Sequence, residues 1–95
     1  MTLDEAKKIV EEERLGPWVI WPDEKRKEYA TWICKEGDKW LVCDCTERAT
    51  VSSATMKYFD EFEAALDMFI KYARLTKWSF VWNWERINHR PYPNK

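Results

Sequence analysis

Three cysteines and a single histidine are the side chains with the most evident capacity for chemistry. Cys34, Cys43 and Cys45 could act as nucleophiles, metal ligands or disulfide partners, and His89 is the lone histidine. A zinc site takes four tetrahedral ligands, and a Cys-x-Cys spacing does not match a zinc knuckle. A nucleophilic thiol needs a neighbouring base, whereas His89 lies in a polar segment near the C-terminus. An odd number of thiols without an export signal also disfavours disulfides, so we predict reduced thiols that act as small core hydrophobes, with no metal and no cofactor.

Other catalytic sets are missing from the sequence. It contains no glycine-rich phosphate loop, no paired histidine ligands and no Ser, His and Asp set with a suitable base. Two acidic pairs, Asp23 with Glu24 and Asp44 with Glu47, are typical of a solvated surface rather than of acid–base chemistry. We therefore predict that the protein is not an enzyme, and a binding module is the class that remains.

The elements that position these side chains begin with a helix. Thr2 and Glu5 form a capping-box pattern, and apolar residues then recur at helical spacing. Gly16 and Pro17 are typical of a helix stop, because glycine adopts the left-handed cap and proline cannot continue the hydrogen-bond ladder. A helix is predicted over residues 3–15.

Three strand-like segments follow. Residues 18–21 are β-branched and aromatic and end at a proline, which predicts a strand near a sheet edge. Residues 28–35 and 39–46 flank Gly37-Asp38, a pair typical of a two-residue hairpin loop because glycine adopts positive φ freely. That loop would set Lys35 opposite Trp40, Cys34 opposite Leu41, Trp32 opposite Cys43 and Ala30 opposite Cys45.

This register predicts two unlike faces for the hairpin. One face collects the three thiols in an apolar layer: Ala30, Trp32, Cys34, Leu41, Cys43 and Cys45. The other face is less apolar, and we expect it to meet solvent or a partner: Tyr29, Thr31, Ile33, Trp40, Val42 and Asp44. A slip of one residue would exchange the two faces.

A weaker strand and a second helix complete the predicted fold. Residues 51–58 form the predicted fourth strand, and Asp60 is the expected N-cap of the helix. One apolar stripe at helical spacing follows: Phe62, Ala65, Leu66, Phe69, Ile70 and Ala73. We predict an α+β domain in which an antiparallel sheet of four strands carries the N-terminal and the C-terminal helix on one face.

The segment after Thr76 contains four aromatic residues at alternate positions: Trp78, Phe80, Trp82 and Trp84. This period of two predicts an extended segment, which would add a fifth strand. A continued helix is the alternative, in which one face would carry Lys77, Val81, Trp84 and Asn88. Two prolines near the end predict a loosely held tail from about residue 86, within a single domain that covers residues 1–95.

Composition and charge restrict the function classes. The chain has 95 residues, of which 45% are hydrophobic, and a net charge of −1. We expect a folded, soluble, cytoplasmic domain, because the sequence shows neither a membrane-spanning apolar run nor a secretory signal. The near-neutral balance disfavours bulk nucleic-acid binding. Residues 71–95, however, hold six basic side chains and one acidic one, which keeps a small nucleic-acid-binding or regulatory protein as the alternative.

Six short segments carry a family resemblance: LDEAKK at 3–8, WVIWPD at 18–23, EYAT at 28–31, KWLV at 39–42, TERAT at 46–50 and FEAALD at 62–67. In this order they resemble the small immunity proteins encoded beside bacterial polymorphic toxins, over about residues 3–75. The resemblance implies a non-catalytic cytoplasmic inhibitor that binds and neutralises a cognate protein toxin. The tryptophan-rich segment after Thr76 departs from the family pattern.

We expect a partner to contact the hairpin and the aromatic end of the chain. Interfaces are enriched in tryptophan, and a small domain does not easily bury seven of them. The predicted anchors are Trp40, Trp78, Trp82 and Trp84. The predicted acidic complement to a basic toxin consists of Asp23, Glu24, Asp44 and Glu47. The alternative is that the rings only close the core or form a homodimer contact.

Overall fold

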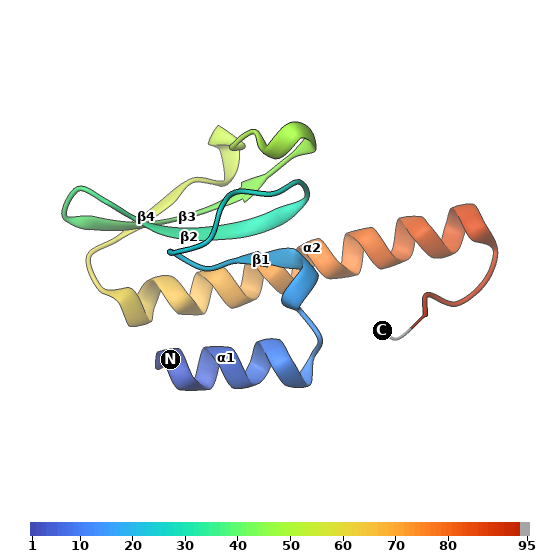
Figure 1. Cartoon of the computed structure of the whole chain (residues 1–95), viewed down its shortest axis with the longest axis horizontal. Coiled ribbons are helices and arrows are strands. Elements are labelled where there is room, and N and C mark those ends of the chain that lie inside the picture. Colours follow the sequence, from blue (N-terminus) through green and yellow to red (C-terminus); the bar gives the residue numbers. More distant parts are fainter. Residues whose placement is uncertain (94–95) are drawn as a thin grey trace.

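The computed structural model describes residues 1–93, which form two α-helices and a four-stranded sheet. The helices are α1 (Leu3–Glu12) and α2 (Phe62–Asn88), and the strands are β1 (Val19–Ile20), β2 (Ala30–Glu36), β3 (Lys39–Cys45) and β4 (Lys57–Phe59). In Figure 1 the sheet forms one layer, α2 lies directly beneath it, and α1 lies on the same side below α2. The predicted α+β class and the four strands are confirmed.

The predicted capping box starts α1. Thr2 Oγ1 accepts the backbone N–H of Glu5 at 3.2 Å, and the Glu5 carboxylate accepts the backbone N–H of Thr2 at 3.1 Å. The helix ends at residue 12 instead of the predicted residue 15, because Arg14 adopts φ +55° and a 3-10 turn over Gly16–Trp18 follows. This turn buries Trp18 and directs the chain into β1.

The sheet is mixed, so the predicted antiparallel arrangement is wrong. Its strand order is β1-β2-β3-β4, in which β1 runs parallel to β2 and the other neighbours are antiparallel. Residues 21–29 cause the difference, because they carry the chain back along the sheet before β2 starts, whereas a tight hairpin would have reversed its direction. The first strand is also shorter than the predicted segment 18–21.

The β2–β3 hairpin has the predicted register. Its pairs include Ala30 with Cys45, Trp32 with Cys43, Cys34 with Leu41 and Lys35 with Trp40. Gly37 lies in the two-residue turn with φ +64°, a conformation that favours glycine. Sequence alone therefore predicted the strand pairing correctly, as expected when turn chemistry and side-chain alternation agree.

The neighbours of the two hairpin faces differ from the prediction. Ile33 and Val42, on the face expected to meet solvent or a partner, are fully buried and pack against α2. The thiol face is covered instead by residues 46–56, from which Val51 and Met56 pack on the cysteine layer. The expectation failed because both faces carry enough apolar area to be buried, so alternation alone could not decide which face the helix covers.

The start of α2 differs from the prediction, although its apolar stripe does not. The N-cap is Glu61, whose side chain makes no capping hydrogen bond. Asp60, the predicted cap, instead forms an ion pair with Lys39 of β3. The buried members of the predicted stripe are Ala65, Leu66, Phe69, Ile70 and Ala73.

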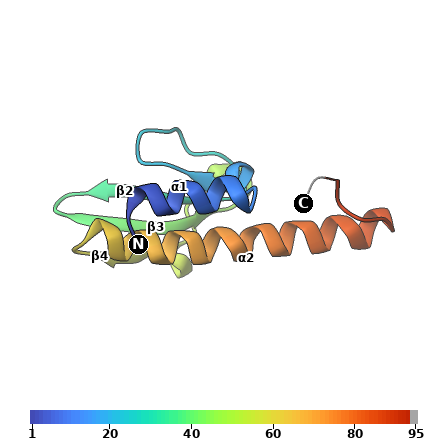
Figure 2. The ribbon, with the colours of Figure 1, turned by 90° about the horizontal axis from the view of Figure 1, so that it is seen from below.

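The segment after Thr76 continues α2, so the predicted extended segment and fifth strand are wrong. With 27 residues, the helix is about 40 Å long. Its first half lies under the sheet, whereas its second half projects beyond it (Figures 1 and 2). The aromatic alternation was misleading because Trp78, Phe80 and Trp82 are all exposed, and a period of two therefore marks no buried sheet face here. Residues 76–88 are called the overhang below.

The first residues of the predicted tail are helical. Residues 86–88 form the last turn of α2, which ends where His89 adopts φ +54°. The chain then turns back, and the backbone N–H of Tyr92 donates to a carboxylate oxygen of Glu85 at 2.8 Å. Residues 94–95 of the predicted tail lie outside the described residues. The fourth strand is Lys57–Phe59, so it includes only residues 57 and 58 of the predicted segment 51–58, in which Val51 forms a single bridge with Cys45.

Candidate binding surface

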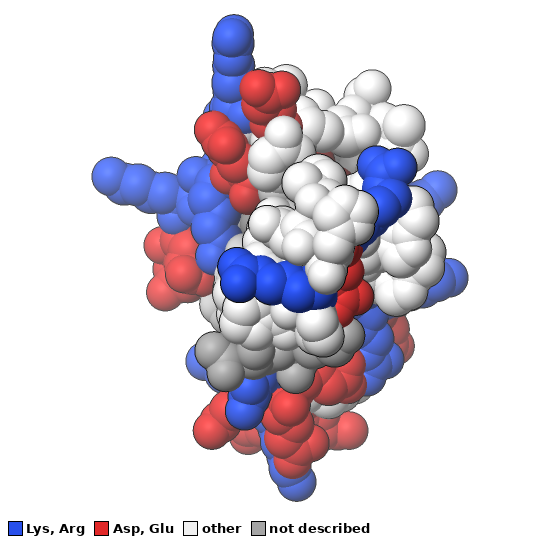
Figure 3. All heavy atoms as spheres, turned by 90° about the vertical axis from the view of Figure 1, so that its right-hand side faces the viewer, with Lys and Arg blue, Asp and Glu red and all other residues white. Residues whose placement is uncertain are grey.

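The overhang and the residue just before it expose a stripe of large apolar side chains. Leu75, Trp78 and Trp82 follow one another at i, i+3 and i+7, and their exposed fractions are 56%, 65% and 51%. This spacing places the three side chains along one side of α2, where Trp78 and Trp82 lie beside the end of α1 and Leu75 lies toward the end of β3. These three residues are called the exposed stripe. Seen from this end of the molecule, a broad area of uncharged atoms is crossed by Lys and Arg side chains (Figure 3).

Cationic side chains accompany the tryptophans of the overhang. The guanidinium of Arg86 lies over the ring of Trp82, 5.1 Å from its centroid. The guanidinium of Arg90 lies over the ring of Trp84, 5.3 Å from its centroid. Such cation–π contacts are favourable and restrict the rotation of both side chains. The surface therefore combines exposed rings with positive charge.

A second set of rings attaches the overhang to the domain. Tyr92 packs edge-on against Phe80 and Trp84, with centroid distances of 5.9 and 5.2 Å. Phe80 also packs on the buried Trp18, at 5.6 Å between centroids. Trp84 is half-buried in this cluster, unlike the two tryptophans of the exposed stripe. Of the predicted anchors on the overhang, Trp84 thus contributes to packing.

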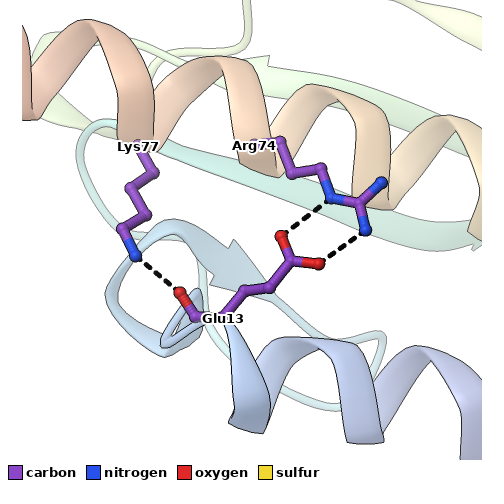
Figure 4. A network of polar contacts seen from close by, with 3 residues as sticks. All are labelled: Glu13, Arg74 and Lys77. Carbon is purple, nitrogen blue, oxygen red and sulfur yellow. Dashed lines mark hydrogen bonds and ion pairs between the residues drawn. The ribbon is translucent and has the colours of Figure 1, made fainter. Parts of the chain in front are cut away.

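A polar junction ties the base of the overhang to the end of α1. The guanidinium of Arg74 donates to both carboxylate oxygens of Glu13, at 2.9 and 2.6 Å. The ammonium of Lys77 donates to the backbone carbonyl of Glu13 at 2.5 Å (Figure 4). The hydrogen bonds from Arg74 hold the pKa of the Glu13 carboxyl below its usual value. These contacts fix the position at which α2 leaves the domain.

A groove runs between the end of the hairpin and the overhang. Its volume is about 560 Å³, and its lining includes Tyr29, Asp44, Thr76, Phe80, Trp84 and Ile87. Asp44 is the one charged residue among the described residues that line it. The wall contributed by α2 is largely apolar, with Ile87 exposed to 70%. This feature is called the Asp44 groove.

The carboxylate of Asp44 is half-buried and bonded to neutral groups. Thr31 Oγ1 donates to Asp44 Oδ1 at 2.7 Å, and the backbone N–H of Asp44 donates to Thr55 Oγ1 at 2.8 Å. Burial raises the pKa of the Asp44 carboxyl, and hydrogen bonds from Thr31 and Thr76 offset only part of that effect. Within residues 1–93, no Lys or Arg forms an ion pair with this carboxylate. Its charge is therefore stabilised by neutral donors.

Trp40 lies apart from the tryptophans of the overhang. Its ring packs on Phe62 at the start of α2, with the centroids 4.4 Å apart, and the Lys35 ammonium lies 5.0 Å from its centroid. Residues 62 and 78 are separated by about 24 Å along the helix axis. Trp40 therefore belongs to the packing around the first half of α2 and not to the surface formed by the overhang.

The predicted acids lie on three separate segments. Asp23 and Glu24 are exposed in the loop between β1 and β2, where the Glu24 carboxylate accepts the backbone N–H of Trp21 at 2.8 Å. Glu47 is exposed in the segment after β3, and Asp44 opens into its groove. The structure thus brings Trp78 together with Trp82, and Asp44 together with Trp84. It does not gather all eight predicted site residues on one surface.

Sequence reasoning missed three exposed apolar residues, Leu75, Phe80 and Ile87. The alternative prediction, in which the helix continues past Thr76, would have indicated them. At about 100° per residue, a helix that continues past residue 76 places Leu75 on the same face as Trp78 and Trp82. Phe80 and Ile87 then share a second face, which in the structure lines the Asp44 groove. Recognising these faces required the correct secondary structure first.

The three thiols are free and buried, as predicted. Burial raises the pKa of Cys43 to about 12, and it raises the pKa of Cys34 and of Cys45 as well. A thiol with so high a pKa stays protonated at neutral pH and is a poor nucleophile. Among residues 1–93, no group of three or more His, Cys, Asp or Glu side chains is placed to hold a metal ion.

Comparisons with protein-family models, with curated protein sequences and with solved structures found no match. Neither helix of the described chain combines the length and the apolar character needed to cross a bilayer. The function must therefore be inferred from the surfaces of the protein and from the six sequence segments that resemble immunity proteins.

Proposed function

We propose that the protein is a cytoplasmic, non-catalytic immunity protein that neutralises a cognate bacterial toxin by binding it. The observation that carries this proposal is the exposed stripe on the overhang. Tryptophan and arginine are enriched at the centres of protein interfaces, and Trp78, Trp82 and Arg86 lie together on this helix. The resemblance of residues 3–75 to immunity proteins supplies the class of partner.

The way the overhang is held also favours protein recognition. The helix that carries the exposed rings is held before binding by the Tyr92 cluster and by the Glu13 junction. Association of an ordered surface loses less conformational entropy than association of a flexible one. A helix that leaves the body of a domain can also enter a groove of a partner with one face, which is a common recognition mode.

The acidic residues suit a basic toxin. Asp23, Glu24 and Glu47 are exposed on loops rather than placed around the exposed stripe. Exposed charges at the rim of an interface mainly raise the association rate, whereas buried aromatic anchors supply most of the affinity. We therefore assign the acids to steering and the two tryptophans of the exposed stripe to affinity.

The absence of turnover is part of the proposal. It is supported by the buried, protonated thiols, of which Cys43 has a pKa of about 12. A thiol enzyme would need an accessible thiolate beside a base. Variants in which both Cys43 and Cys45 are replaced, once by serine and once by alanine, distinguish an inhibitor from a thiol enzyme. An inhibitor that still folds should keep its protection, whereas a thiol enzyme should lose all activity.

Co-expression with the product of the neighbouring gene, which the proposal expects to be the cognate toxin, tests the proposed function. The wild-type protein should restore growth and form a stoichiometric complex with that toxin. The double variant Trp78→Ala, Trp82→Ala should lose protection while its melting temperature changes little. Tyr58→Ala is the matched control, because Tyr58 is an aromatic residue exposed to 49% on β4. Full protection by the double variant, or none by the wild type, would refute the proposal.

A nucleic-acid-binding or regulatory protein is the second candidate. The stacked pairs Arg86 with Trp82 and Arg90 with Trp84 favour it. Rings and guanidinium groups bind single-stranded nucleic acid by stacking and charge neutralisation, which makes binding strongly dependent on salt. Tight binding of a single-stranded oligonucleotide that weakens steeply from low to moderate salt, and that Trp82→Ala abolishes, would favour this candidate over a toxin inhibitor.

A homodimer through the exposed stripe is disfavoured by charge. Two antiparallel copies of α2 that pack through the exposed stripe would bring Lys71 of each copy near Arg86 of the other. Like charges placed opposite one another destabilise an interface. Sedimentation at increasing salt tests this, since a dimer that forms only at high salt would show that the repulsion is the limiting factor.

A further inference from the structure

The Asp44 groove has the chemistry of a receptor for a cationic side chain. A half-buried carboxylate loses solvation, and proteins usually compensate such a charge with Lys or Arg. Here Thr31 donates to Asp44, and no Lys or Arg of residues 1–93 forms an ion pair with it. The carboxylate also opens into a groove large enough for a side chain, at about 560 Å³. A cation that enters from outside would therefore be stabilised.

The walls of the groove decide which cation fits. Phe80 and Trp84 contribute aromatic rings, and Ile87 adds apolar surface. A guanidinium is planar, weakly hydrated and stacks on aromatic faces, whereas an ammonium is compact and strongly hydrated. A metal ion such as Mg²⁺ or Ca²⁺ needs several oxygen ligands, and Asp44 is the one carboxylate among the described lining residues. The groove thus fits arginine better than lysine or a metal.

We propose that the Asp44 groove receives an arginine side chain of the partner protein, with the guanidinium on the Asp44 carboxylate and the aliphatic stem along Phe80 and Ile87. This inference rests on the proposed function, because a basic toxin supplies the arginine. It gives α2 two binding surfaces. Trp78 and Trp82 lie on one of them, and the other, which includes Leu75, forms a wall of the groove.

A titration with a small probe tests the groove without any toxin. The probe is N-acetyl-arginine amide at millimolar concentrations, followed by the amide and indole signals of Asn83, Trp84 and Ile87 in heteronuclear NMR spectra. N-acetyl-citrulline amide is the matched control, because it keeps the shape of arginine without the charge. Arginine amide should shift these signals in a saturable way, and citrulline amide should bind much more weakly. Equal binding of the two probes, or shifts elsewhere only, would overturn the inference.

A matched pair of variants locates the charge that binds the probe. Asp44→Asn keeps a hydrogen-bond acceptor for Thr31. It should lower the affinity for arginine amide by about tenfold or more, since a hydrogen bond between charged groups is lost. Its melting temperature should stay the same or rise, because a half-buried charge without a cation is removed. Asp38→Asn, in the exposed hairpin turn, should bind the probe as the wild type does. An Asp44→Asn variant that binds as tightly as the wild type would refute the assignment.

The toxin assay then separates this inference from the proposed function. If the groove binds arginine amide through Asp44 but the wild type protects no cell, the proposed function fails and the groove remains a receptor for cations. If the wild type protects and Asp44→Asn, although folded, forms the complex with unchanged affinity, the groove is not used and the inference fails alone. A loss of toxin affinity in Asp44→Asn, with Asp38→Asn unchanged, supports both.

Discussion

The two halves of α2 share one continuous helix but have opposite surroundings. Residues 62–73 lie against the sheet, and five of them are buried: Ala65, Leu66, Phe69, Ile70 and Ala73. Residues 76–88 have a single buried member, Val81, and carry Trp78 and Trp82 in solvent. The first half thus contributes to the core of the domain, while the second half exposes two tryptophans that the core does not bury.

This difference shows how a small domain can hold an exposed apolar surface without collapsing onto it. An isolated helix of about 13 residues would be marginally stable in water. The overhang is instead nucleated by the anchored half and held at its base by Arg74 and Lys77. Near its end it is held by the Tyr92 ring. The exposed stripe is therefore presented on a supported helix and stays available for a partner.

Truncating a core ring should give the largest effect on stability. Phe69→Ala removes a fully buried ring that packs on Trp21 at 5.0 Å between centroids, and it leaves a cavity. We expect a loss of about 3–5 kcal/mol in the free energy of unfolding, measured by denaturant titration. A loss below about 1 kcal/mol would mean that the first half of α2 is not the anchored half.

Hydrogen exchange should divide the helix at the edge of the sheet. Amides of residues 66–73 should exchange only through global unfolding, because the surrounding core must open first. Amides of residues 82–88 should exchange much faster through local fraying, since few buried contacts hold them. The measurement is the protection factor of each amide. Equal protection along the whole helix would show that the overhang is as tightly held as the core.

Acid should weaken the junction at the base of the overhang. Hydrogen bonds from Arg74 lower the pKa of Glu13 in the folded state below its usual value of 4.5. The pair therefore stabilises the fold above the unfolded-state pKa, and this contribution is lost as the pH falls through the lower folded-state pKa. Both side chains are partly exposed, so the effect at neutral pH is about 0.2–1 kcal/mol.

The variant Glu13→Gln isolates this contribution. It should be less stable than the wild type at neutral pH, and the difference should shrink toward zero as the pH falls below about 4. Glu11→Gln is the matched control, because Glu11 is an exposed carboxylate of the same helix that forms no ion pair within residues 1–93. A difference from the wild type that does not change with pH would contradict the electrostatic origin.

Truncating the exposed stripe should give the smallest effect on stability. Trp78 is exposed to 65%, and alanine favours helix, so Trp78→Ala should change the free energy of unfolding by no more than about 0.5 kcal/mol. Toxin affinity should nevertheless fall by about 2 kcal/mol or more if Trp78 is an interface anchor. Calorimetry on the same samples measures both quantities. A variant that unfolds readily would instead assign Trp78 to the core.

Local rules predicted the elements whose signals lie within a few residues of each other. The capping box of Thr2 and Glu5, the hairpin turn at Gly37 and the buried stripe through Phe69 all follow from short-range chemistry and side-chain periodicity. The burial of the three thiols also followed, because the hairpin register sets them on one face. These features are determined by the sequence itself.

Tertiary structure decided three features: the direction of β1, the hairpin face that α2 covers, and the helical conformation of residues 76–88. Each depends on which apolar surface another element covers, and several arrangements satisfy the same local pattern. Ile33 and the thiol layer are both apolar enough to be buried, so only the placement of α2 and of residues 46–56 distinguishes them. The Asp44 groove arises in the same way, because it exists only where α2 passes the end of the hairpin and sets Phe80 beside a carboxylate 36 positions earlier in the chain.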